Sequence, residues 1–66
     1  MEMIIAILLW LQVMVGGGHY TQAQYDTMVQ DNEAVINQVM LDPTMQTAIM
    51  QEYGLVAMTV VVADEE

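Results

Sequence analysis

The chain has 66 residues, 56% of them hydrophobic, and its nine Asp and Glu residues are opposed by no Lys or Arg, so the formal net charge is −9. Contacts to nucleic-acid phosphates and to anionic lipid headgroups rely on Lys and Arg, so this composition argues against direct nucleic-acid binding and against electrostatic docking on a membrane. The absence of cysteine excludes disulfides and thiolate metal sites.

The length allows one small domain over residues 1–66. A chain of this size buries only about 60% of the surface that its unfolded form exposes, so small domains usually need disulfides, a metal or association with other chains. A net charge of −9 also repels itself in a compact monomer. We therefore expect stabilisation by other protein chains, either copies of this one or partners with basic surfaces.

Residues 3–15, MIIAILLWLQVMV, form the most apolar segment, and Gln12 is its one polar residue. A helix here would be apolar on all sides, and Gly16 would end it. A strand is the alternative, because Glu2 and Gln12 would then share one face, and the chain would read β-α-α-β. We favour the helix, because the run is long for a strand.

The same segment is short for a membrane span. It has 13 residues, whereas a spanning helix needs about 20 apolar residues. We therefore favour an interface with another chain, followed by membrane insertion, and place a self-contained core last. The side chains predicted to contact a partner or a membrane come from both apolar ends of the chain: Ile4, Ile5, Ile7, Leu8, Leu9, Trp10, Leu11, Val13, Val56, Met58, Val60 and Val62.

Three glycines, Gly16, Gly17 and Gly18, start a predicted hinge over 16–19, because consecutive glycines resist regular structure. A helical pair is predicted to follow over 20–54. Its first helix, 22–41, is amphipathic and begins with a capping box in which Thr21 is the N-cap and Gln24 is the third helical residue.

Asp42 and Pro43 end this first helix and start the next, with Asp42 as N-cap. The second helix is predicted over 43–53, with Gly54 as its stop. The stretch 55–63 is rich in β-branched residues and predicts an apolar strand, followed by an acidic tail at 64–66. If the first segment is a helix, this strand has no predicted partner in the chain. The expected fold class is therefore mainly α with an extended or β C-terminal segment.

No pattern of catalytic or metal-binding residues is present. His19 is the only histidine, and the sequence Asp31-Asn32-Glu33 lacks the alternating ligands of a calcium-binding loop. Serine and cysteine nucleophiles are absent. The eight methionines are typical of an adaptable packing surface and form no cluster of metal ligands. We therefore predict a non-enzyme with no catalytic, cofactor or metal site.

The favoured function is a structural subunit of a large multi-chain assembly, such as a minor virion or capsid-associated protein or a small subunit of a membrane complex. It would be located with that assembly, and its apolar terminal segments would hold it there. One alternative is a small membrane-inserted regulator or pore-forming peptide. Another is a soluble acidic module that blocks a basic site on a partner.

Overall fold

The computed structural model describes the backbone of residues 2–63 and the side chains of residues 3–63. It is mainly helical with a short two-stranded parallel sheet, which confirms the predicted fold class. The acidic tail predicted at 64–66 lies outside the described residues. In chain order the elements are α1 (Glu2–Trp10), β1 (His19–Thr21), α2 (Gln22–Asp31), α3 (Glu33–Met40), α4 (Pro43–Ala57) and β2 (Val61–Ala63).

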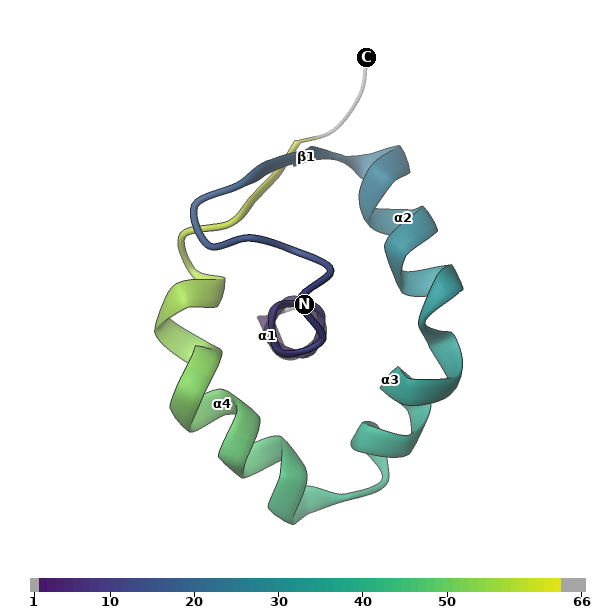
Figure 1. Ribbon diagram of the computed structural model, residues 1–66, viewed down its shortest axis with the longest axis vertical. Coiled ribbons are helices and arrows are strands. Elements are labelled where there is room, and N and C mark those ends of the chain that lie inside the picture. The colour runs from purple at the N-terminus through teal and green to yellow at the C-terminus, as the bar shows by residue number, and fades with distance from the viewer. Residues whose placement is uncertain (1, 64–66) are drawn as a thin grey trace.

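The elements that follow α1 form a ring around it. Viewed down the shortest axis of the molecule, α1 is seen end-on at the centre, and α2, α3 and α4 surround it (Figure 1). The ring closes where β1 and β2 pair in parallel, with His19 opposite Val61 and Thr21 opposite Ala63. The first and last elements of the ring, β1 and β2, thereby hold each other, and α1 lies at the centre.

Helix α1 forms the centre of the hydrophobic core. Ala6, Ile7 and Leu8 are each 0% exposed. A helix that is apolar all round must be covered on every side, and the ring supplies that cover. The sequence favoured an interface or a membrane for this segment and placed a self-contained core last. The structure buries Ile5 to Leu9 within the chain's own core, and contact of this segment with a partner or a membrane stays a prediction. None of the described helices is long and apolar enough to cross a membrane.

The end of α1 is set by Gln12 and not by Gly16, the predicted stop. Gln12 adopts φ 64°. Its N–H donates to the Leu9 carbonyl at 3.0 Å, and the Val13 N–H donates to the Leu8 carbonyl at 2.9 Å. These two bonds are those of a Schellman motif, which satisfies the last free carbonyls of a helix. The strand alternative for 3–15 is therefore wrong, and the favoured helix is shorter than the apolar run.

The amphipathic helix predicted over 22–41 is two helices, because Asn32 interrupts it. The Asn32 side-chain Nδ2 donates to the Met28 carbonyl at 2.8 Å. A side chain that bonds to a backbone carbonyl in this way offers the backbone an alternative to the helical ladder. Asn32 also has φ −115° and ψ 18°, outside helical geometry. The resulting bend lets α2 and α3 follow the outline of α1 (Figure 1).

Helix α4 begins where the sequence predicts but ends later. The Asp42 side chain accepts a hydrogen bond from the Met45 N–H at 3.2 Å, and Pro43 occupies the first turn. Gly54 lies inside the helix, which continues to Ala57. A single glycine weakens a helix by only about 0.5–1 kcal/mol relative to Ala, so it does not have to end one. The predicted strand over 55–63 is accordingly reduced to Val61–Ala63.

The expectation that this strand lacks a partner in the chain is also wrong. Its partner β1 lies in the stretch immediately after the three glycines, and the first residue of β1 falls within the predicted hinge. Strand β1 is too short to be recognised from the sequence. A three-residue strand carries almost no periodicity, so the His19–Thr21 sequence could not be distinguished from a loop.

Candidate interaction surface

The three glycines form a closed turn in this structure. The Gly18 N–H donates to the Val15 carbonyl at 3.0 Å. Gly17 adopts φ +75°, in the left-handed region that disfavours residues with a Cβ atom. The Val15 N–H donates to the Tyr20 hydroxyl at 2.9 Å. The turn is therefore held at several points, and the flexibility of the predicted hinge stays a prediction.

This turn is attached to the C-terminal end of α4. The Gly17 N–H donates to the Thr59 Oγ1 at 2.9 Å, and the same hydroxyl donates to the Val56 carbonyl at 2.6 Å. The backbone of Gly16 lies so close to Val56 that a Cβ atom on Gly16 would be 2.7 Å from Val56 Cγ1. Two segments that are distant in the sequence therefore form one continuous surface.

That surface is apolar and exposed. We call it the α4-end surface, and its large side chains are Val15, Leu55, Val56, Met58 and Val61. Leu55 is 82% exposed, and Val15 and Met58 are each 69% exposed. Isolated exposed apolar residues are normal on soluble proteins, but several on adjoining segments indicate an interaction site.

A second, smaller group lies at the other end of α4. Met40 and Leu41 mark the corner between α3 and α4, and Leu41 is 84% exposed, whereas Val35 lies near the start of α3. We call Met40 and Leu41 the corner surface. Residues 43–54 of α4 separate the two surfaces, which corresponds to about 18 Å at 1.5 Å per residue. Seven of the eight large exposed apolar side chains of the described residues belong to one of these two groups, and the eighth is Val35.

Acidic residues border both surfaces. Glu52 is exposed and precedes Leu55 and Val56 by three and four residues on α4, which places the three side chains on adjacent positions of one helix face. At the other end, exposed Asp42 directly follows Leu41. The chain contains no Lys or Arg that could pair with these carboxylates. Each apolar surface is therefore next to uncompensated negative charge.

The twelve side chains predicted to contact a partner have three different environments. Five are buried in the core: Ile5, Ile7, Leu8, Leu9 and Val60. Five are partly buried against it: Ile4, Trp10, Leu11, Val13 and Val62. Val56 and Met58 are exposed and belong to the α4-end surface. Partner contact stays a prediction for all twelve, and in this fold Val56 and Met58 are the pair that is accessible.

The predicted caps are placed as the sequence indicated. The Gln24 N–H donates to the Thr21 Oγ1 at 3.1 Å, and the Thr21 N–H donates to the Gln24 Oε1 at 2.9 Å. These reciprocal bonds form the capping box that starts α2. They also fix the point where β1 ends and α2 begins.

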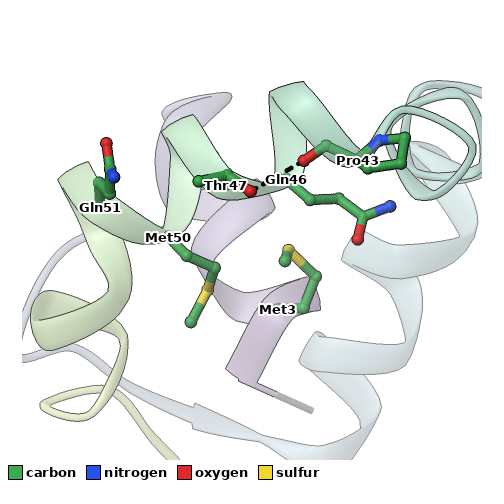
Figure 2. A pocket seen from close by; sticks show the side chains of 6 residues that line it. All are labelled: Met3, Pro43, Gln46, Thr47, Met50 and Gln51. Carbon is green, nitrogen blue, oxygen red and sulfur yellow. Dashed lines mark hydrogen bonds between the residues drawn. The ribbon is translucent and has the colours of Figure 1, made fainter.

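A shallow groove lies at the start of α1, between Met3 and α4 (Figure 2). Its volume is about 460 Å³. Figure 2 shows Met3 of α1 facing Met50 and Gln46 of α4. No titratable side chain lines it: the lining residues are Met3, Pro43, Gln46, Thr47, Met50 and Gln51. The groove therefore has no acid or base in its lining for proton transfer.

A second hollow, of about 620 Å³, lies between α1 and α2 and is more polar. Tyr25, Asp26 and Glu33 contribute to its lining. Burial, reinforced by the neighbouring Asp26 charge, raises the pKa of Tyr25. The Tyr25 phenol therefore stays protonated near neutral pH. A protonated phenol has no ionised oxygen to accept a proton, so Tyr25 is a poor general base there. Within the described residues no group of three or more His, Asp or Glu side chains is arranged to hold a metal ion.

No protein-family model, curated protein or solved structure matches this chain. Functional proposals therefore depend on the surfaces described above. Three of their most exposed members, Val15, Leu41 and Leu55, were absent from the predicted contact residues. Leu41 and Leu55 each lie at or near a helix end, where the helical apolar pattern stops. That position could have indicated from the sequence that the two side chains are exposed.

Proposed function

We propose that this protein is a non-enzymatic structural subunit that joins two neighbouring protein surfaces within a multi-chain assembly. The supporting observation is the grouping of seven of the eight large exposed apolar side chains of the described residues into the α4-end surface and the corner surface, at opposite ends of one helix. A rigid helix with an apolar contact at each end is suited to hold two neighbours at a fixed separation. A virion or a membrane complex is the favoured kind of assembly.

The charge of the chain supports partners with basic surfaces. Glu52 and Asp42 lie beside the two apolar surfaces, and the net charge is −9. Interfaces commonly place an apolar centre inside a polar rim, and complementary charge in the rim accelerates association. Partners should therefore present an apolar patch surrounded by Lys or Arg, and their association should slow as salt is raised.

The same charge favours a second candidate, a soluble acidic module that blocks a basic site on a partner. That function would need the carboxylates but neither apolar surface. The two candidates therefore differ in their response to substitution of exposed leucines, and one experiment separates them.

The test replaces Leu55 or Leu41 with Asp and measures how much variant chain is recovered in the native assembly relative to the unaltered chain. Each substitution should reduce recovery about tenfold or more, because a charge in the apolar centre of an interface costs over about 1.4 kcal/mol. Gln30→Asp is the matched control, since Gln30 is exposed on α2 outside both surfaces. It adds the same charge and should leave recovery unchanged.

The two single variants also test for two separate contacts. Leu55→Asp and Leu41→Asp should each remove a different neighbour from the isolated complex. Recovery of both variants at the unaltered level would contradict the structural-subunit proposal. If recovery instead falls with added salt and not with either substitution, the acidic module is the better account.

A further inference from the structure

The outer edge of β2 is an unused strand edge beside the α4-end surface. The Val61 N–H donates across the sheet to the Gly18 carbonyl at 3.0 Å. Successive backbone amides of a strand point to opposite edges, so the N–H and C=O of Val62 face away from β1. The sheet has two strands, so among the described residues no strand lies on that edge.

The corresponding edge of β1 is less available. Its outward-facing amides are those of His19 and Thr21, and the Thr21 N–H is already bonded to the Gln24 Oε1 at 2.9 Å. This bond is half of the capping box, so an incoming strand would have to break the start of α2. The edge of β2 has no such competing bond among the described residues. Strand addition at β2 is therefore the less costly of the two.

We propose that the partner at the α4-end surface contributes an extended segment that pairs with β2 as a third strand. This inference rests on the proposed function, because it names the kind of partner that the same surface takes. A two-stranded sheet is marginal in water, and a third strand adds backbone hydrogen bonds on an edge that otherwise invites pairing. Val61 is 43% exposed and Met58 is 69% exposed, so apolar side chains on the incoming strand find apolar surface to cover.

Charge identifies the occupant as a basic segment from another protein. The sequence continues directly from β2 into Asp64, Glu65 and Glu66, and Glu52 precedes the exposed Leu55 on α4. Lys or Arg residues that alternate with apolar residues on the incoming strand would complement these carboxylates. A second copy of this chain is a poor occupant, because it would bring another net charge of −9 and no Lys or Arg.

The test adds a probe strand to the complete chain. A Gly-Ser-Gly-Ser linker after Glu66 is followed by the hexapeptide Val-Lys-Val-Thr-Val-Lys, which the linker holds at about millimolar effective concentration. Amide hydrogen exchange at Val62, followed by NMR, reports pairing at the outer edge. Two control extensions replace the central Val-Thr by Pro-Pro, which removes donors toward both edges, or both Lys by Glu, which removes the charge complementarity.

Exchange at Val62 should slow about tenfold or more with the Lys probe relative to the Pro-Pro control, and less with the Glu probe. Equal exchange with the Lys probe and the Pro-Pro control would overturn the inference. So would slowing in the unextended chain as its concentration rises, because that would make a second copy the occupant. Failure here leaves the proposed function standing if Leu55→Asp still reduces recovery in the native assembly, so the two results are distinguishable.

Discussion

Residues 3–15 and 55–63 are the two most apolar segments of the chain, and the fold treats them in opposite ways. The first gives α1, whose side chains from Ile5 to Leu9 are buried. The second combines the last turn of α4, a loop and β2, and it leaves Leu55 and Met58 largely exposed. High hydrophobicity indicates that burial of a segment is favourable. Whether the chain itself can bury the segment depends on the geometry of the element that it forms.

The geometry of each segment explains the difference. A helix that is apolar on all sides can be enclosed by a ring, and α2, α3 and α4 form that ring around α1 (Figure 1). A segment that changes from helix to loop to strand belongs to the ring and has an outer face that the ring cannot cover. That outer face is where we place the partner.

The largest expected effect comes from truncating a leucine in the first segment, and the matching truncation in the second segment should have little effect. Leu8 is 0% exposed, so Leu8→Ala should lower the free energy of unfolding by about 2–5 kcal/mol, because it leaves a cavity in the core. Leu55→Ala should change it by about 0.5 kcal/mol or less, because Leu55 is 82% exposed. Urea unfolding followed by circular dichroism measures both. Equal losses would show that the two segments are not buried differently.

A smaller effect is expected at the glycine turn, which follows the first segment in the chain and is hydrogen-bonded to Thr59 of the second. Gly17 has φ +75°, and no atom lies within 4 Å of the place that a Cβ atom would take, so Gly17→Ala meets a backbone cost without a steric clash. That cost is about 1–2 kcal/mol. Gln12, at φ 64°, already bears this cost, so Gln12→Gly should stabilise the fold or leave it unchanged. Thermal unfolding of both variants measures whether each substitution raises or lowers stability. Destabilisation by both would contradict the positive φ angles of Gly17 and Gln12.

The start of α4, the helix that separates the two exposed surfaces, offers a third test. Asp42→Ala should lower the free energy of unfolding by about 1 kcal/mol, because it removes the side-chain bond to the Met45 N–H. Asp42→Asn is the matched control, since Asn is an equally good N-cap and removes the charge. Denaturant unfolding should rank Asn close to the unaltered chain. A loss with Asn as large as with Ala would assign the effect to charge.

The smallest expected effect concerns Tyr25, the buried residue of α2. Burial raises the pKa of Tyr25 above its ordinary value of 10.0, so the folded state holds the proton more tightly than the unfolded state. The free energy of unfolding should not depend on Tyr25 ionisation well below pH 10.0 and should fall as the pH rises through the folded-state pKa. In Tyr25→Phe this part of the decline should disappear. A variant whose alkaline profile matches that of the unaltered chain would contradict the burial of this phenol.

Sequence reasoning was most successful where a local rule determines structure. The capping box at Thr21 and Gln24 and the N-cap at Asp42 are local patterns, and the helices begin where they predict. The predicted stops were less successful. Gly16 and Gly54 do not end helices, because a glycine permits an ending without requiring one.

Tertiary relations were harder to predict. The pairing of β1 with β2 depends on the ring closing around α1, and no local pattern in the sequence encodes that closure. The same holds for the exposed surfaces. Val15 and Val61 become neighbours of the α4 end only because the glycine turn bonds to Thr59 and Val61.

The central claim is that α1 is the internal core while the end of α4 remains open to a partner. Native-state hydrogen exchange of the isolated chain tests it most directly, because amides buried in the core exchange only when the whole fold opens. We predict that the amides of Ile7, Leu8 and Leu9 exchange most slowly, while those of Met58 and Thr59 exchange much faster. Rapid exchange throughout α1 in the folded chain would contradict this claim.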